Sequence, residues 1–360
     1  CMGITHHTHG TATVQQIANI ALLRGMIGKK HAGLLPIRGH SNVQGMGSMG
    51  VTPALKKAVF DRLSSEGVSV PPMDGFDTLS CIQAANRREM DFAFCLGGNL
   101  YGSNPDSSAT TSALSNIDMV VYASTALNTG HVWGAGKETI VLPVTTRDEE
   151  YEPTTQESMF NFVRLSSGGI HRHENLKSEV QVIVEIAKRV FGESGLYKWD
   201  DFKNHDSIRM LVSRIVPGFE SFESIDKTKN EFQIPGRVLH KPVFPTDSGK
   251  ARFIYHSIPK KKPLEKNEFQ LMSVRSEGQF NTVVYEDKDL YRGQERRDVV
   301  LMNENDMASI ALIKNSPVLV KSKTGALHNI LARPFDIKEG AVLMYYPEVN
   351  SLISRAIDPL

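Results

Sequence analysis

The first part of the chain alternates between helical periodicity and segments that have no apolar rhythm. Over residues 11–28, apolar side chains recur three or four positions apart, which predicts a helix with one buried face. A second helix is predicted to begin at Thr52 and Pro53, a capping threonine and a first-turn proline, and to continue to Gly67. Between the two helices, residues 36–50 read PIRGHSNVQGMGSMG, and this stretch is predicted to be a glycine-rich loop.

Residues 77–144 alternate helices with short, continuously apolar strands. The predicted helices lie near 77–90 and 107–116, and the predicted strands at 91–98, 118–124 and 138–144. Short apolar strands separated by helices are typical of a parallel sheet covered by helices. Such sheets bind ligands at the carboxyl ends of their strands. The loop GGNLYGSNPD at 97–106 follows one of these strands and is therefore a candidate ligand-binding loop.

The pattern changes near residue 240. An amphipathic helix is predicted at 174–192, and a mixed region continues to about 235. Beyond 240 the segments FQLMSV, DVVLMN, PVLVKS, LHNILARP and AVLMYY are separated by turns, a pattern typical of a β-barrel-like domain. The sequence therefore predicts an α/β protein with two domains, a parallel-sheet region over 1–235 and a β-barrel domain over 240–360.

Composition and charge exclude several classes of partner. The chain has 360 residues, of which 40% are hydrophobic and 22% charged, as expected for a globular protein with more than one core. Its 41 Lys and Arg residues balance 40 Asp and Glu residues, so no broad field favours nucleic acid or an anionic membrane. The basic run PKKKPLEK at 259–266 is better explained as a solvated linker than as a docking patch.

The cysteines and the longest apolar runs indicate a protein of the cytosolic type. Cys1, Cys81 and Cys95 match no C-x-x-C spacing, so they are predicted to be reduced thiols. No apolar run approaches the ~18 to 20 residues that a membrane span needs, and no signal-peptide pattern opens the chain. Cys1 is interpreted as an internal residue of a longer polypeptide, because CMGITHHTHG resembles the end of a strand that enters a turn. A targeting signal therefore cannot be assessed.

Histidines form the first group of candidate functional residues. The tract THHTHG contains His6, His7 and His9, but three imidazoles this close in sequence cannot all face one ion on regular secondary structure. A metal site built from this tract alone is therefore disfavoured. At a helix N-terminus these side chains are better placed to hold an anion or a polar heterocycle. His171 and His173, in GGIHRHEN, are predicted to lie in an exposed loop.

Arg38 and the segment RSEGQFN form the second group. Arg38 is an always-charged planar fork among glycines, and it either braces the fold through a distant carboxylate or orients an anionic group. The spacing leaves both alternatives open. RSEGQFN, at 275–281, is either a polar turn or a cluster of donors that face a ligand. Asn303 is predicted to cap a short helix and has no chemical role. No Ser-His-Asp, phosphate-loop or paired-carboxylate motif is present above background.

Several motifs together resemble the molybdopterin oxidoreductase (dimethyl sulfoxide reductase) family. The segments are MGITHHTHGTATVQQIANIALLRGMIGKKHAGLLPIRGHSNVQG, LGGNLYGSNPD, ETIVLP, SVRSEGQFNT, VVLMNENDMASIAL, VKSKTGALHNILA and YYPEVNSLISRAIDP, in the family's order. On RSEGQFNTVVYEDKDLYRG and STALNTGH, the chain is most similar to the formate-dehydrogenase-like branch. The resemblance implies a dinucleotide-binding parallel-sheet region followed by a double-psi β-barrel.

The resemblance also implies that this chain is the carboxyl-terminal half of a larger subunit. The cysteine-rich segment for a [4Fe-4S] cluster, and the segment that can carry a protein ligand to molybdenum, would belong to the missing amino-terminal half. The β-barrel would be truncated at its end. The implied partners are that half, a small-molecule substrate and an electron-transfer protein.

Site residues follow from the same resemblance, position by position. Arg38 matches an arginine that positions the anionic substrate in formate dehydrogenases, and His40 stands where that branch usually has a glutamine near the cofactor. The substitution adds a titratable group, so the substrate need not be formate. The expected contacts to the bis-molybdopterin guanine dinucleotide are Met2, Gly3, His6, Asn99, Ser103, Arg275, Gln279, Asn281, Tyr345 and Asn350. None of them is expected to bind the metal.

The implied activity is two-electron oxidation or reduction at molybdenum or tungsten, with the protein supplying orientation and charge. The alternative is a cofactor-free scaffold or electron-transfer subunit that keeps the family fold. Arg38 and the donors of RSEGQFN favour the enzyme, because a scaffold needs no buried donors without a ligand to satisfy them. A histidine-based metal-binding protein is the least favoured alternative.

Overall fold

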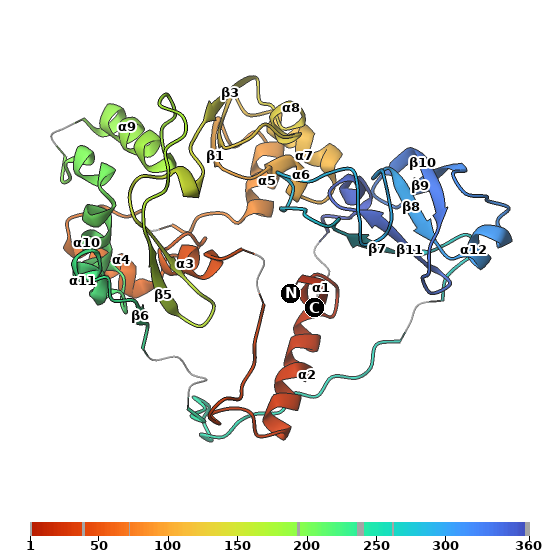
Figure 1. Ribbon diagram of the computed structural model, residues 1–360, viewed down its shortest axis with the longest axis horizontal. Coiled ribbons are helices and arrows are strands. Elements are labelled where there is room, and N and C mark those ends of the chain that lie inside the picture. Colours follow the sequence, from red (N-terminus) through yellow and green to blue (C-terminus); the bar gives the residue numbers. More distant parts are fainter. Residues whose placement is uncertain are drawn as a thin grey trace. The chain divides into compact units, whose positions relative to one another are not determined.

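The structure is a computed structural model that describes residues 2–37, 40–71, 73–192, 195–235, 241–260 and 263–356. The chain forms two compact units, each built from separate segments (Figure 1). The first contains Cys1–Gly75 and Thr145–Pro259, and the second contains Phe76–Val144 and Lys260–Ile357. The domain boundary expected at residues 235–240 stays a prediction, since these units follow compactness rather than chain order.

The first unit is mainly helical. Its helices are α1 (Met2–Thr5), α2 (Gly10–Leu23), α3 (Val43–Ser48), α4 (Lys57–Ser65), α9 (Glu179–Phe191), α10 (His205–Ile215) and α11 (Ile225–Thr228). Strands β4 (Thr154–Glu157), β5 (Phe162–Ser166) and β6 (Phe232–Gln233) form an antiparallel sheet in that order. Side chains of α4, β5, α10 and the turns that follow it form the core, among them Val59, Val163, Ile215, Phe219 and Phe222.

Two local predictions for this unit are wrong at the chain's start. The opening residues form α1 rather than the end of a strand. A Cβ atom at Gly10 would lie 2.2 Å from the Thr5 carbonyl oxygen, so glycine is what lets α2 begin so close to the end of α1. The stretch 36–50 is not wholly a loop, because it contains α3.

The predicted cap at Thr52 and Pro53 is also wrong, since α4 begins at Lys57. The Thr52 hydroxyl donates to the Ala54 carbonyl at 2.8 Å instead of accepting a helix amide. The Pro53 carbonyl accepts the Gly75 amide at 2.7 Å. These two hydrogen bonds hold the segment as a turn. By contrast, α9 starts with a capping box formed by Ser178 and Gln181, within the range predicted for an amphipathic helix.

The second unit contains the predicted parallel sheet. Strands β1 (Phe92–Leu96), β2 (Met119–Ser124) and β3 (Glu138–Pro143) pair in parallel in that order. The helices are α5 (Thr78–Asn86), α6 (Leu100–Ser103), α7 (Ser107–Leu114) and α8 (Gly130–Trp133). Side chains of α5 and α7 pack with Val120 and Tyr122 of the central strand. Burial beneath helices therefore explains the continuously apolar sequence of β2, whereas β1 and β3 are only partly buried.

A five-stranded sheet forms the rest of the second unit, drawn in blue in Figure 1. It contains β7 (Gln270–Val274), β8 (Val299–Met302), β9 (Pro317–Lys321), β10 (Ala326–Pro334) and β11 (Ala341–Tyr345), in the order β7-β11-β8-β10-β9. Parallel and antiparallel pairs alternate across it. Alternate residues of β8 and β11 enter two different apolar clusters, as expected for the two faces of a sheet.

All five strands expected beyond residue 240 are present, and Asn303 caps α12 (Glu304–Ser309) by accepting the Asn305 amide. The predicted α/β class, with a parallel sheet and a separate multi-stranded sheet, is confirmed. No helix within the described ranges is long and apolar enough to cross a membrane.

A buried ion pair in the first unit allows a stability test. Arg209 on α10 binds both carboxylate oxygens of Asp226, at 2.6 and 2.5 Å, and also donates to the Pro153 carbonyl. We expect Asp226→Ala to reduce the stability of this unit by about 3–5 kcal/mol, because it leaves a buried guanidinium without its counter-charge. Hydrogen exchange of α10 amides at increasing denaturant measures the loss.

The matched control is Asp61→Ala, which removes the exposed partner of Lys57 on α4. Exposed pairs contribute little to stability, so this variant should exchange almost like the parent protein. Equal losses in both variants would contradict a structural role for the Arg209–Asp226 pair.

Candidate functional site

Asn99, immediately after β1, joins three segments of the second unit. Its side chain is buried and caps α6, with Oδ1 accepting the Gly102 amide at 2.7 Å. Its Nδ2 donates to the Thr129 hydroxyl at 2.9 Å and to the Thr282 carbonyl at 3.0 Å. Both amide hydrogens are therefore used within the protein, and Asn99 organises the loop at the carboxyl end of β1.

Glycines make this arrangement possible. A Cβ atom at Gly130 would lie 2.5 Å from Asn99 Oδ1, and one at Gly102 would lie 2.7 Å from Asn99 Nδ2. Gly97 and Gly98, which precede Asn99, have φ angles of +68° and +73°, a region that favours glycine. Gly98 has no neighbour within 4 Å of a Cβ position, so its backbone is open to a ligand.

The last turn of the described chain adjoins the same loop. Asn350 is buried, and its Nδ2 donates to the Gly102 carbonyl at 2.8 Å. Its own carbonyl accepts the Asp106 amide at 2.8 Å. Ser103 is exposed, and its hydroxyl donates to the Asn99 carbonyl at 2.7 Å. The structure thus brings together three of the predicted cofactor residues, Asn99, Ser103 and Asn350.

The segment 275–281 is a tightly bonded turn next to this loop. Gln279 Nε2 donates to the carbonyls of Asn281 and Tyr346 at 2.7 and 2.8 Å, and its Oε1 accepts the Ser276 amide at 3.0 Å. Gln279 therefore holds this turn to the segment that contains Tyr346. Arg275 lies 3.4 Å from Asn281 Oδ1, and its guanidinium is 5.1 Å from the centre of the Tyr346 ring.

Thr282 follows this turn and carries an unsatisfied buried atom. Its side chain is 1% exposed, and among the described residues its Oγ1 has no hydrogen-bond partner. Buried hydroxyls normally have a partner. Because the neighbouring carbonyl of Thr282 accepts from Asn99, this hydroxyl lies where the predicted cofactor residues converge.

With this geometry established, comparisons with known proteins identify the family. Residues 1–189 match the family model described as Molybdopterin oxidoreductase, and residues 269–360 match the model described as Molydopterin dinucleotide binding domain. The chain belongs to the molybdopterin oxidoreductase family. The two matched segments are those whose loops meet at Asn99 and Thr282.

Curated relatives share the similarity over nearly the whole chain. An uncharacterized oxidoreductase of Mycobacterium tuberculosis is 33% identical, over 98% of this chain and 47% of its own length. Protein YdeP of Escherichia coli is 29% identical, over 98% and 49%. The F420-dependent formate dehydrogenase subunit alpha of Methanocaldococcus jannaschii is 24% identical, over 100% and 55%. This molybdopterin oxidoreductase chain therefore spans about half the length of the curated relatives it matches.

A solved structure shares the fold. Acetylene hydratase from Pelobacter acetylenicus superposes with a TM-score of 0.55 at 17% identity, covering 84% of this chain and 44% of the hydratase. At this identity the likeness concerns the fold alone.

Five further predicted residues of the molybdopterin oxidoreductase site lie within the first 40 positions of the chain. Met2 begins α1, Gly3 lies within it, and Gly3, His6 and His40 are exposed. Arg38 lies outside the described residues. Their approach to the residues around Asn99 stays a prediction. In the described ranges no three His, Cys, Asp or Glu side chains are grouped as metal ligands.

Tyr345, which is expected to contact the cofactor, makes an internal hydrogen bond. Its hydroxyl donates to Asp289 Oδ2 at 2.8 Å, and both side chains are buried. Burial and this hydrogen bond raise the pKa of Tyr345. Burial opposes ionisation of Asp289, but hydrogen bonds from Arg292 and Tyr345 outweigh it and lower the pKa of this carboxyl. Tyr345 is thus held in place by Asp289.

Arg297, like Thr282, is a residue of this region that sequence reasoning missed. Its guanidinium binds the Glu348 carboxylate at 2.6 and 3.0 Å, the Ser276 hydroxyl at 2.7 Å and the Tyr346 carbonyl at 2.6 Å. It also lies 5.0 Å from the centre of the Tyr345 ring. Glu348 is 51 positions away in sequence, so no local pattern could have revealed the pair.

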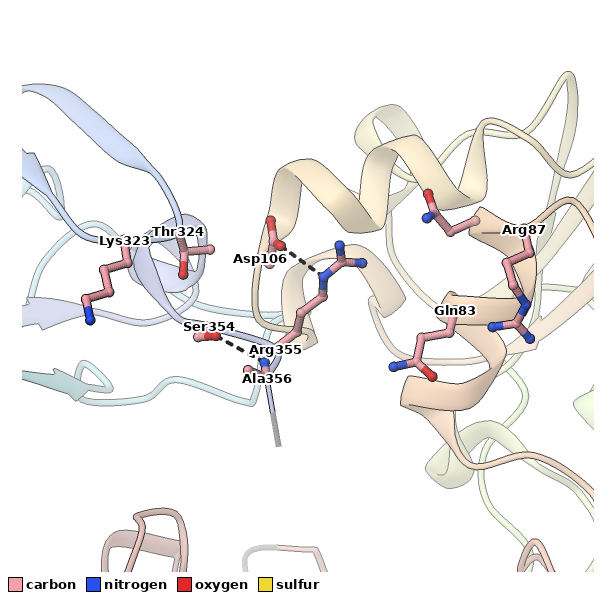
Figure 2. Close-up of a pocket in the computed structure, with 9 residues that line it drawn as sticks. Gln83, Arg87, Asp106, Lys323, Thr324, Ser354, Arg355 and Ala356 are labelled. Atoms are coloured by element: carbon pink, nitrogen blue, oxygen red, sulfur yellow. Dashed lines mark hydrogen bonds and ion pairs between the residues drawn. The ribbon is translucent and has the colours of Figure 1, made fainter. Parts of the chain in front are cut away.

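A polar cavity of about 610 Å³ lies near Asp106 (Figure 2). It is lined by Gln83, Asn86, Arg87, Asp106, Lys323, Thr324, Ser354, Arg355 and Ala356. Arg355 pairs with Asp106 at 3.2 Å, and Figure 2 shows this bond between the segment 354–356 and the start of α7. Arg87 pairs with Glu89, so two of the cavity's three cationic side chains already have counter-charges.

Substitutions of the adjacent residues Arg297 and Arg296 test whether the Arg297–Glu348 ion pair stabilises the second unit. We expect Arg297→Gln to destabilise the second unit by about 3 kcal/mol, because it breaks a buried ion pair. Arg296→Gln removes only an exposed contact with Asp298 and should leave stability nearly unchanged. Hydrogen exchange of β8 and β11 amides measures both. Equal protection in the two variants would show that Arg297 does not support this turn.

Proposed function

We propose that this chain is the cofactor-holding part of a molybdenum- or tungsten-dependent oxidoreductase that acts on a small substrate at a bis-molybdopterin guanine dinucleotide. The observation that carries the proposal is the hydrogen bonding of Asn99. It ties the loop after β1 to the turn after β7, and these loops belong to the two segments that match the family models.

The residues present fit a polar, anionic ligand of this kind. Thr282 Oγ1 is buried without a partner among the described residues, and Arg275, in the turn that precedes Thr282, offers a half-buried guanidinium. The open backbone of Gly98 adds amide groups of the kind that meet phosphate oxygens at the ends of parallel strands. The donor set therefore suits the phosphates and heterocycle of a dinucleotide.

When bound, the cofactor supplies the two-electron chemistry at its metal. Arg275 would neutralise ligand charge, and Thr282 would gain the hydrogen bond that it lacks. Asn99 and Gln279 would act indirectly, since their amide hydrogens already hold the surrounding loops. Arg38 would hold the anionic part of the substrate, a preorganised electrostatic contribution, with His40 as a nearby titratable group. The [4Fe-4S] cluster and the electron-transfer partner are proposed for the rest of the protein.

A cofactor-free scaffold is the second candidate, and one observation favours it. The side-chain hydrogen bonds of Asn99, Gln279 and Tyr345 are made within the chain, so this part of the fold would persist without a ligand. The partnerless Thr282 hydroxyl favours the enzyme instead.

Cofactor content tests the proposal directly. Full-length protein purified under anaerobic conditions, from cells able to make the cofactor, should contain about one molybdenum or tungsten and two pterins per chain. Gly130→Ala should lower pterin content several-fold, because its Cβ would lie 2.5 Å from Asn99 Oδ1. Metal analysis and fluorescence of released pterin measure both.

The control for this variant is Gly47→Ala in α3, where a Cβ atom meets nothing within 4 Å. It should retain the parent cofactor content. A folded parent protein with neither metal nor pterin would contradict the enzyme proposal and favour the scaffold.

The role of Arg38 is tested separately. Arg38→Ala in the full-length enzyme should lower turnover without releasing cofactor, because the guanidinium is proposed to hold substrate charge. Arg38→Lys keeps the positive charge but not the planar fork, so it should recover part of the activity. Steady-state kinetics and pterin content are measured together. Unchanged turnover in Arg38→Ala would remove the residue from the mechanism.

A further inference from the structure

His131, in α8, contacts the end of β2 and the loop that follows it, at the carboxyl end of the parallel sheet. Its Nδ1 accepts the backbone N–H of Asn128 at 3.3 Å, and its Nε2 lies 3.1 Å from the hydroxyl oxygen of Ser124. Because a backbone N–H can only donate, Nδ1 must carry no proton. The neutral ring therefore carries its hydrogen on Nε2 and donates it to Ser124.

The residues that His131 holds are the ones that contact the loop after β1. Asn128 Nδ2 donates to the Gly98 carbonyl at 3.2 Å, and its Oδ1 accepts the Gly130 amide at 2.9 Å. Thr129 Oγ1 accepts from Asn99 Nδ2 at 2.9 Å. The position of residues 128–130 thus determines two of the hydrogen bonds that fix Gly98 and Asn99.

We propose that His131 is a positioning residue whose neutral ring holds residues 128–130 against Gly98 and Asn99. Protonation of the ring would then loosen these two residues and weaken cofactor binding. The inference rests on the function proposed above. Protonation would put a hydrogen on Nδ1, facing the Asn128 N–H. The acceptor that fixes the loop would then be replaced by a second donor, and two donors repel.

The surroundings keep this ring neutral. Burial lowers the pKa of His131 from its ordinary value of 6.5. Tyr122 on β2 packs edge-on against the ring, with 5.0 Å between ring centroids, and burial raises its pKa. Cys95, paired with Tyr122 on β1, has its pKa raised to about 11 by burial. Neither neighbour changes charge between about pH 5 and 8, the range in which histidine titrates.

The sign of the pH effect follows from the lowered pKa. The unfolded chain binds a proton to His131 at a higher pH than the folded chain does, so this group destabilises the folded loop as the pH falls. Its contribution is fully present above pH 6.5 and is lost below that value, as the pH approaches the lowered folded pKa.

Two substitutions separate the two hydrogen bonds of the ring. In His131→Asn, the shorter amide can place its oxygen near the position of Nδ1 and keep the acceptor for Asn128, without a group that titrates. In His131→Gln, the longer amide reaches toward Ser124 and gives up that acceptor. His328→Asn, on an exposed part of β10, is the matched control.

The experiment uses full-length protein loaded with cofactor and measures the pterin retained after incubation at pH 5.5 and 7.5. The parent protein and His328→Asn should lose pterin at the lower pH. His131→Asn should retain it at both values, and His131→Gln should retain roughly fivefold less than the parent at pH 7.5, the effect of one lost hydrogen bond. The inference would be overturned if His131→Asn and His131→Gln retained equal amounts of pterin. It would also be overturned if both variants lost pterin with the same pH dependence as the parent protein.

Hydrogen exchange of residues 125–131 in the same samples keeps the two proposals distinguishable. A parent protein without any pterin at pH 7.5 would contradict the proposed function, not the role of His131. In that case, the protection of these amides at pH 5.5 and 7.5 is compared after correction for the intrinsic exchange rates. Lower protection at pH 5.5 in the parent, but not in His131→Asn, would still support the inference. Identical protection ratios in the two proteins would refute it.

Discussion

The buried side-chain amide of Asn99 is the constraint on which the second unit's site depends. A buried amide that lacks partners costs about 1–3 kcal/mol, so the surrounding segments must bring it an amide, a hydroxyl and a carbonyl. These come from Gly102, Thr129 and Thr282. Because Thr282 is 183 positions away in sequence, the requirement joins the parallel sheet's loop to the turn after β7 and fixes where a ligand can lie.

Arg297 is a second buried side chain that holds the turn after β7 in place. It neutralises Glu348, bonds Ser276 and the Tyr346 carbonyl, and lies against aromatic rings. Together the two centres use the side chains of several residues expected to touch the cofactor, Asn99, Gln279 and Tyr345 among them. These residues hydrogen-bond within the chain, and their contacts with the cofactor stay a prediction. Arg275, Thr282 and the backbone of Gly98 are the groups proposed to meet the ligand directly.

This division of labour is consistent with the chemistry of the molybdopterin oxidoreductase family. A cofactor that carries the reaction needs a protein that holds it in one place and controls nearby charge. Loops whose polar side chains are hydrogen-bonded within the chain meet the first need. In the proposal above, the hydrogen bond that His131 Nδ1 accepts makes the position of these loops depend on pH. His40 lies in the other unit and Arg38 outside the described residues, so the roles proposed for them are tested on the full-length protein.

The sequence by itself determined the elements whose signal is local. Periodicity located α2, α9 and the strands of both sheets in the second unit, Asn303 marked the start of α12, and motif order identified the family. Local patterns gave wrong helix starts where a distant residue forms a competing hydrogen bond. The Gly75 amide, for example, donates to the Pro53 carbonyl and holds Pro53 in a turn, so α4 begins only at Lys57. Only the tertiary structure decided that Asn99 is an organiser and that Arg297 matters. Apart from Gly102, their partners lie from tens to nearly two hundred positions away, and hydrogen bonds at that separation leave no periodic trace in the chain.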